Sequence, residues 1–447
     1  MKLVSLTLSV LILSTGLVFA REVQLTLSEA LALAEKHDPA LANARLDIED
    51  GDALVNEAYS AAMPTVNFIG VGGRYAVAPS MNIPAFGGRI RFQPVNDITA
   101  QLSVDQPLWL GGRVGLALDA ARTYRKIARC GLSVNKAQLK SAVIKEYYSL
   151  TLARQALEVL TETFRQAEKH AATAQAMFDV GMASEFDVLR ANTAVKAIEP
   201  ELARAKMMVD LAETQLRQRL GLQPDDHIVV ADQLEQPTLQ TRLVKSEAMQ
   251  SALKMRPEFK MMDLQLQLRS IALQVEERSI YWPNFFFNAT YQLQASDDHI
   301  LQVGPPDWAK SLRLQLVASV PLFDGFAAPA RVEKSKIALR RAEVQRRQLE
   351  QGVNLEITAA LNELKRAEDL VASQNAAVET ARKAFDIAGV RYEQGMGTEL
   401  EIQDARLALN GARLNLLQGL YDLKVAQAEY ARCVHNDDKL SADSPSE

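Results

Sequence analysis

The sequence predicts a mainly helical protein that also carries membrane-spanning β-strands and is built from two structural repeats. Three observations support this fold class. Blocks of residues recur about half a chain length apart, short segments alternate polar and apolar residues, and two long proline-free segments repeat apolar residues every seven positions.

The first residues match an export signal. Lys2 is followed by an apolar run, Leu3 to Phe19, that ends in the small-residue cleavage pattern Val18-Phe19-Ala20. We expect residues 1–20 to be cleaved. A retained anchor is disfavoured, because Arg21-Glu22 leads at once into an amphipathic stretch.

Charge and reactive side chains exclude several function classes. The formal net charge is −5, from 50 basic and 55 acidic residues, which argues against nucleic acid as a partner. Cys130, Cys433 and the 5 histidines show no ligand-pair spacing, so we expect no metal site and no cofactor. Neither a Gly-x-Ser-x-Gly motif nor a phosphate-binding glycine loop occurs, so we expect that the protein is not an enzyme.

The internal repeat organises the chain. Two segments recur 218 positions later: Ser28-Glu29-Ala30 as Ser246-Glu247-Ala248, and Asp38-Pro39 as Arg256-Pro257. Two more recur 214 positions later: Pro107-Leu108-Trp109-Leu110-Gly111 as Pro321-Leu322-Phe323-Asp324-Gly325, and Gly181-Met182-Ala183-Ser184-Glu185 as Gly395-Met396-Gly397-Thr398-Glu399. A period this long indicates a duplicated half-molecule, each half ordered as helix, hairpin, very long helix, turn and helix.

The first helix of each repeat is expected from about Ser28 to Ala62 and from Ser246 to Tyr281, before Pro64 and Pro283. Beyond each proline the apolar period changes to two, which is typical of strands. The clearest alternation places these apolar residues on one face: Phe285, Phe287, Ala289, Tyr291 and Leu293, then Leu312, Leu314, Leu316 and Ala318. The strand from Thr65 to Tyr75 is the least regular, because three glycines interrupt it.

The strands are expected to cross a membrane. About ten residues suffice for a tilted strand to span a bilayer, and the three tryptophans lie at strand ends, where an interfacial aromatic girdle is expected: Trp109, Trp282 and Trp308. A half-buried soluble sheet is the alternative. Four strands cannot close a barrel, so two, three or four copies would have to join, and spacing does not choose among these numbers.

The long helices, Arg113 to Val180 and Phe326 to Gln394, carry a heptad of apolar residues with alanine at one seam position, which lets neighbouring helices approach closely. We expect a multi-helix tube, with an ordinary dimeric coiled coil as the alternative. Glycine followed by Ser or Thr then predicts a turn into a second helix at Gly181 and at Gly395.

Two carboxylates, Glu401 and Asp404, stand three residues apart and share one helix face beyond the second turn. Such a pair often marks only a solvated face. In a tube made of several copies, however, the carboxylates would recur around its narrow end, attract cations and repel anions.

The residues resemble the TolC-like outer membrane efflux proteins. The resemblance rests on the Pro-Leu-(Trp/Phe)-x-Gly junctions at Pro107 and Pro321 and on the duplicated turn motif, which in the second repeat runs from Arg391-Tyr392 through Gly395, Thr398, Leu400 and Ile402 to Ala405. It implies a homotrimer in the outer membrane, with one shared 12-stranded β-barrel and a long helical tunnel, a coiled-coil-like α-barrel, through the periplasm. It also implies a passive exit duct for efflux or type I secretion.

The resemblance implies partners and sites as well. An inner-membrane transporter would act through a periplasmic adaptor that docks at the helical tips, for which the candidates are Val180, Gly181, Met182, Ser184, Gly395, Gly397, Thr398 and Leu400. The channel constriction would comprise Glu401 and Asp404, with Tyr392 in the gate network. Some family members carry a basic residue that closes the gate where this chain has Gly397, which puts a salt bridge at that position in doubt. The alternative function is a soluble periplasmic coiled-coil adaptor or scaffold.

The predicted division of the chain follows from these segments. It starts with a signal peptide (1–20). The first repeat (21–220) has strands at about 65–76 and 96–106, a long helix 113–180 and a helix 184–220, and an equatorial segment (221–245) follows it. The second repeat (246–435) has strands at about 284–294 and 311–320, a long helix 326–394 and a helix 398–434, and a disordered tail (436–447) ends the chain.

Overall fold

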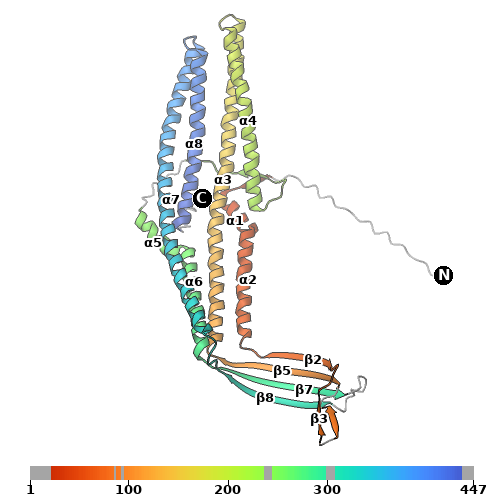
Figure 1. Cartoon of the computed structure of the whole chain (residues 1–447). Helices are drawn as coiled ribbons and strands as arrows, with labels where there is room; N and C mark the ends of the chain where they lie inside the picture. The colour runs from red at the N-terminus through yellow and green to blue at the C-terminus, as the bar shows by residue number, and fades with distance from the viewer. Residues whose placement is uncertain (1–21, 85–86, 92–94, 236–243, 298–307, 435–447) are drawn as a thin grey trace, which may run out of the picture. The chain divides into compact units, whose positions relative to one another are not determined.

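A computed structural model describes residues 22–84, 87–91, 95–235, 244–297 and 308–434 of the chain. The predicted signal peptide and tail lie outside these residues, as does part of the predicted equatorial segment. The chain divides into two compact units, one made of residues 43–133 and 257–351 and the other of the remaining segments. Figure 1 labels most of the helices and strands, which are described below.

The unit of residues 43–133 and 257–351 holds a four-stranded antiparallel sheet in the order β2-β5-β7-β8 (Figure 1). Its strands are β2 (Thr65–Arg74), β5 (Asn96–Leu110), β7 (Asn284–Asp297) and β8 (Ala309–Ser319). A small hairpin of β3 (Ser80–Ile83) and β4 (Gly88–Arg91) lies between β2 and β5 in the chain. Strands from both repeats therefore form one sheet, in which β5 of the first repeat pairs with β7 of the second.

The register of the sheet separates an apolar face from a polar face. Partners at one level across the four strands are all apolar: Phe68, Leu102, Tyr291 and Leu312. Partners at the next level are polar: Asn67, Ser103, Thr290 and Arg313. The alternation seen in the sequence thus becomes a two-faced sheet, because successive side chains of a strand point to opposite sides.

The tryptophans lie at both ends of this sheet. Trp109 near the end of β5 and Trp282 just before β7 pack edge to face, with ring centroids 5.4 Å apart. Trp308 precedes the first residue of β8, at the opposite end of the sheet. The contact between Trp109 and Trp282 requires a glycine at position 111. The φ of Gly111 is 63°, and a Cβ there would lie 2.8 Å from the Cβ of Trp282.

The prediction of one continuous first helix in each repeat is wrong. The first repeat begins with two helices, α1 (Leu27–His37) and α2 (Pro39–Ser60), and the second repeat begins with α5 (Lys245–Met255) and α6 (Pro257–Tyr281). Asp38 and Arg256 interrupt them with extended ψ values of 124° and 125°. The reason is the following proline, whose ring disfavours a helical conformation in the residue before it. Thr26 caps the start of α1, where its side chain accepts a hydrogen bond from the backbone of Glu29.

The other unit holds most of two helical hairpins, including residues 134–179 of α3 and 352–393 of α7. In the first, α3 (Arg113–Asp179) turns into α4 (Glu185–Leu220), and Arg219 pairs with Glu146 at 2.7 Å. In the second, α7 (Ala327–Glu393) turns into α8 (Glu399–Val434), and Arg366 lies 3.8 Å from Asp422. At 1.5 Å per residue, the 67 residues of α3 or α7 reach about 100 Å. None of the helices within the described ranges has the length and apolar composition that crossing a membrane requires.

A parallel pair of short strands, β1 (Glu22–Leu25) and β6 (His227–Val230), connects the residues before α1 to the segment between the repeats. No pattern in the sequence predicted this pair. The hydroxyl of Tyr147 on α3 donates to Leu25 O at 2.9 Å and lies 2.8 Å from an oxygen of Asp232, which anchors the strands against the hairpin.

Candidate channel constriction and docking tips

The two interhelical turns have the same hydrogen bonds. Gly181 N donates to Phe178 O, and Met182 N and Ala183 N donate to Met177 O. The equivalent amides of the second turn, those of Gly395, Met396 and Gly397, bond in the same way to Tyr392 O and Arg391 O. The leading glycines have φ values of 74° and 70°, in the left-handed region that glycine adopts without strain. The repeated sequence thus specifies a repeated turn.

Most of the candidate docking residues are exposed on these turns. Val180 and Met182 expose 70% and 77% of their surface. Gly181, Ser184, Gly395, Thr398 and Leu400 are also exposed, and Gly397 is half-buried. Each tip therefore exposes backbone and apolar groups.

The helices that follow the turns start differently in the two repeats. Ser184 caps α4 in a reciprocal arrangement with Asp187, which lowers the pKa of that carboxyl. Thr398 caps α8 by accepting from the amide of Glu401, the residue equivalent to Asp187. The Glu401 carboxylate lies 3.7 Å from Nε of Arg391. Arg391 therefore offsets part of the negative charge of Glu401.

The predicted constriction carboxylates, Glu401 and Asp404, are both exposed on the first turns of α8. Tyr392 is separate from them, since it is buried in a cluster with Ala388 and Ile402 against which Met177 of α3 packs. Burial and the neighbouring Glu399 carboxylate, with a smaller effect of Asp187, raise the pKa of Tyr392 to about 12. The phenol is therefore neutral at physiological pH, and its surroundings join the two hairpins.

Three charged or titratable residues around Tyr392 were missed by the sequence analysis. The ring of His170 on α3 lies 5.5 Å from that of Tyr392, and its Nδ1 lies 3.9 Å from Oε2 of Glu399. Glu399 and Arg406 on α8 are only 5% and 4% exposed. No spacing rule identifies them, because charged residues at a helix start and one or two turns later usually face solvent.

The buried charges are incompletely satisfied. Gln403 donates to one oxygen of Glu399 at 2.9 Å, while the other oxygen and Nε of Arg406 have no hydrogen-bond partner among the described residues. Burial lowers the pKa of Arg406, and the negative charge of Glu399 counteracts this effect. Two opposite charges are thus buried on α8, and one of them, Glu399, lies close to His170 of the other hairpin.

A possible metal-binding group was also not predicted. Ligand atoms of Glu356, Glu429 and Cys433 lie within 4.8 Å of one another. Arg432 binds both carboxylates, and Arg256 donates to Glu356 at 2.7 Å, so that cations already occupy the positions a metal would need. Burial raises the pKa of the Cys433 thiol to about 11, which disfavours the thiolate that metals bind. The group is better explained as an ion-pair network than as a metal centre.

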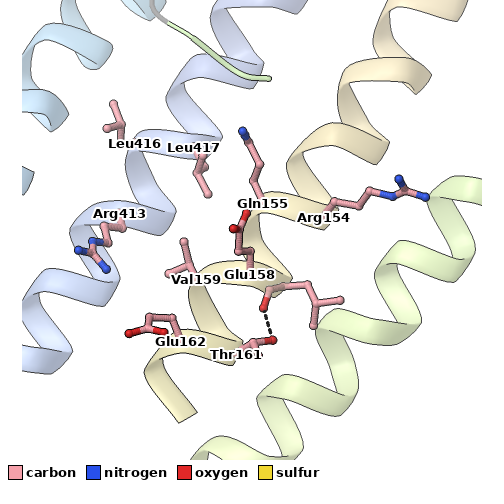
Figure 2. A pocket seen from close by; sticks show the side chains of 10 residues that line it. Arg154, Gln155, Glu158, Val159, Thr161, Glu162, Arg413, Leu416 and Leu417 are labelled. Atoms are coloured by element: carbon pink, nitrogen blue, oxygen red, sulfur yellow. Dashed lines mark hydrogen bonds between the residues drawn. The ribbon is translucent and has the colours of Figure 1, made fainter. Parts of the chain in front are cut away.

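A groove of about 750 Å³ lies between α3 and α8, away from the tips. Figure 2 shows that its side chains come from both helices, among them Gln155, Glu158 and Glu162 of α3 and Arg413 and Leu417 of α8. None of the predicted site residues lines this groove. The candidate site therefore remains the exposed tips and the α8 carboxylates.

Comparison with known proteins identifies the family. The sequence pattern of the outer membrane efflux proteins matches residues 30–222 and 248–432, which cover most of both repeats. The chain is 26% identical to protein CyaE of Bordetella pertussis, over 86% of this chain and 78% of that protein. It is 22% identical to the outer membrane efflux protein BepC of Brucella suis, over 90% of this chain and 83% of that protein.

The fold agrees with this assignment. The crystal structure of the Campylobacter jejuni CmeC outer membrane channel superposes with a TM-score of 0.76, at 17% identity, over 91% of this chain and 85% of that one. The mainly helical, TolC-like fold predicted from the sequence is thereby confirmed, and the family consists of efflux proteins rather than enzymes. The chain belongs to the outer membrane efflux protein family and is located in the outer membrane, from which it extends into the periplasm.

Proposed function

We propose that this protein is the outer-membrane channel of a tripartite efflux or type I secretion system. It acts as a passive exit duct, and an inner-membrane transporter supplies the energy through a periplasmic adaptor. Family membership supports the channel role, and the duplicated, exposed tips support a partner that docks there. The soluble scaffold considered above is disfavoured by the family and its location in the outer membrane.

The single observation that carries the proposal is a two-faced sheet that one chain does not close. β2 and β8 are the outer strands of the four, and in the described part of the chain neither pairs with another strand along its outer edge. Open edges are not tolerated in lipid, because unpaired backbone groups there cost several kcal/mol each. We infer a homotrimer in which three sheets form a 12-stranded barrel with the apolar face toward lipid.

The proposed channel constriction consists of Glu401 and Asp404, repeated once per subunit, with Tyr392 in the gate behind them. Charges of one sign around a narrow channel favour the passage of ions of the opposite sign. Because Arg391 lies close to Glu401, Asp404 contributes more of the net negative charge than its neighbour. The channel should therefore select cations, and Asp404 should dominate this selectivity.

The proposed docking surface for the adaptor consists of the candidate residues on the two turns, from Val180 to Ser184 and from Gly395 to Leu400. Exposed apolar side chains beside stiff turns bury area without a large loss of conformational entropy. Two nearly equivalent turns per chain would offer an adaptor six similar positions around a trimer.

Ion selectivity in planar bilayers tests the function. The purified wild-type protein should form cation-selective channels. Changing Glu401 and Asp404 together to alanine should reduce the cation-to-anion permeability ratio by about tenfold, since several charges around the passage are lost. The single change Asp404→Ala should have a larger effect than Glu401→Ala.

A matched control is Glu379→Ala, which removes an exposed carboxylate of α7 that pairs with Lys383. This variant should keep the wild-type selectivity. An unchanged permeability ratio in the double variant would contradict the constriction, and a wild-type protein that stays monomeric without detergent would contradict the channel itself.

A further inference from the structure

Two cations stand on the four-stranded sheet at the end that is remote from the helices. β2 starts at Thr65, shortly after α2, and β8 ends at Ser319, shortly before α7. Because the helical part of this fold extends into the periplasm, these ends of the strands are periplasmic, and the opposite ends lie at the outer surface. At those outer ends, Arg74 is the last residue of β2 and Lys310 is the second residue of β8.

Both cations lie on the apolar face of the sheet. Side chains at alternate positions of a strand share a face, so Arg74 lies on the same side of β2 as Phe68. By the same rule Lys310 lies on the same side of β8 as Leu312, which occupies the level of Phe68 in the sheet. Phe68 and Leu312 are 73% and 66% exposed in the single chain, and both cations are exposed as well. The apolar face therefore ends in positive charge at the outer surface.

The same face of β2 is open between Phe68 and Arg74. The two intervening positions on this face are Gly70 and Gly72, and a Cβ built on Gly72 would meet nothing within 4 Å. Neither glycine has a positive φ, so the backbone conformation does not require glycine at either position. The two glycines leave a strip of backbone without side chains, to which a hydrocarbon chain can pack.

The two cations stand at opposite edges of the sheet in one chain and on adjacent strands in the proposed trimer. Closure of the barrel pairs β8 of one subunit with β2 of the next, because these are the outer strands of the four. Strands of a closed barrel are tilted and staggered, so that their ends reach the same membrane surface. Arg74 and Lys310 thus approach one another across each subunit boundary. We define the seam surface as Arg74, Gly72 and Gly70 of one subunit together with Lys310 and Leu312 of the next.

We propose that the seam surface binds a phosphate-bearing lipid of the outer leaflet and that this lipid bridges neighbouring subunits. The phosphate is held between Arg74 of one subunit and Lys310 of the next, and an acyl chain packs over Gly70 and Gly72. Guanidinium and ammonium groups form charge-assisted hydrogen bonds with phosphate, and each basic residue near a membrane surface strengthens the binding of anionic lipid about fivefold. The inference rests on the proposed trimeric barrel and adds a ligand that stabilises it.

Interfacial anchoring is the simpler role for such cations. Long basic side chains at a membrane boundary extend their charged ends into water and hold a protein at its depth. Anchoring of this kind selects no particular lipid and does not require that the two cations act at one site. The number and chemistry of the bound lipids therefore distinguish the two roles.

The test is native mass spectrometry of the full-length trimer, purified in detergent, stripped of lipid and titrated with lipid A. We expect one bound lipid A per subunit and slower dissociation of the trimer when the lipid is bound. Dephosphorylated lipid A keeps the acyl chains, and inorganic phosphate has none. Each should bind about tenfold more weakly than lipid A, because each fits only one part of the seam surface.

Four variants make the test specific. Arg74→Gln and Lys310→Gln should each weaken the binding of lipid A about fivefold, and the double variant about 30-fold, as expected when both residues contact one phosphate. Gly72→Leu should weaken binding without removing a charge, because the leucine occupies the space of the acyl chain. Arg313→Gln is the matched control, since it removes an exposed cation from the opposite face of β8, and it should leave binding unchanged.

Other results would overturn the proposal. Two lipids per subunit, of which each single variant removes one, would exclude a shared site at the seam. Undiminished binding in the Arg74→Gln, Lys310→Gln double variant, or an equal loss in Arg313→Gln, would leave only interfacial anchoring for the two cations. Failure of the proposed channel looks different, because the wild-type protein would then be monomeric both with and without lipid.

Discussion

At the scale of single residues, the second tip depends on two glycines for different reasons. Gly395 has a φ of 70°, and its absent Cβ would meet nothing within 4 Å, so the constraint there is conformational. At Gly397 a Cβ would lie 3.1 Å from the backbone nitrogen of Tyr392, so the constraint is space. Ala183, in the equivalent turn with the same hydrogen bonds, shows that this crowding can be relieved.

These reasons predict different costs of alanine at the two positions. Gly395→Ala should destabilise the turn by about 1 kcal/mol, because a side chain in the left-handed region is strained. Gly397→Ala should cost less than about half of that, since the neighbouring backbone has only to shift slightly. Amide hydrogen exchange at the α7–α8 junction measures both, and equal effects would contradict this account.

At the scale of elements, the end of α4 is joined to β6 by one buried carboxylate. Glu213 accepts from the backbone nitrogen of Ile228 at 3.1 Å and pairs with Arg217 at 3.0 Å and with His227 at 3.2 Å. Burial by itself would raise the pKa of Glu213, but these bonds outweigh it and lower the pKa below its usual value. The carboxylate therefore stabilises the unit in its charged form.

Changing Glu213→Gln should lower the free energy of unfolding by about 1–3 kcal/mol, because the half-buried Arg217 loses its charged partner and the buried amide of Ile228 loses a charged acceptor. The wild-type contribution is present above the pKa of the unfolded state, about 4.3, and is lost as pH falls through the lower folded pKa. Thermal unfolding of the detergent-solubilised protein at pH 7 and pH 4 measures this. The variant should lose less stability on acidification than wild type, and an equal loss would exclude Glu213 as a source of acid sensitivity.

At the scale of the whole molecule, insertion into the membrane depends on the two faces of the sheet. Leu314 lies on the apolar face of β8, 63% exposed in the single chain, and the next residue, Gln315, lies on the polar face opposite Asn288. Such exposure of a leucine is compatible with lipid around the sheet and unfavourable in water.

Arginine at these adjacent positions should therefore have opposite consequences. Leu314→Arg should reduce assembly in the outer membrane strongly, because a cation facing the bilayer centre costs about 2–4 kcal/mol. Gln315→Arg, the matched control, should assemble normally, since the native Arg313 already lies on the same face. Membrane fractionation and the yield of crosslinked oligomer measure the difference, and equal yields would contradict the assignment of the faces.

Patterns local in sequence determined most of this architecture. The repeat, the period-two strands and the glycine turns predicted the two helical hairpins and the four strands, because turns and alternating faces depend on residues close in the chain. One local effect was overlooked, namely that proline disfavours a helical conformation in the residue before it. This effect divides the first helix of each repeat, at Asp38-Pro39 and at Arg256-Pro257.

Tertiary structure alone decided which charges are buried. Glu185 and Glu399 occupy equivalent positions and have the same chemistry, yet only Glu399 lies against the other hairpin, near His170. The pairing of β5 with β7 and of β1 with β6 likewise joins segments about 200 residues apart. Such contacts depend on how distant surfaces meet, and the desolvation that sets the energy of a charge arises only when they do.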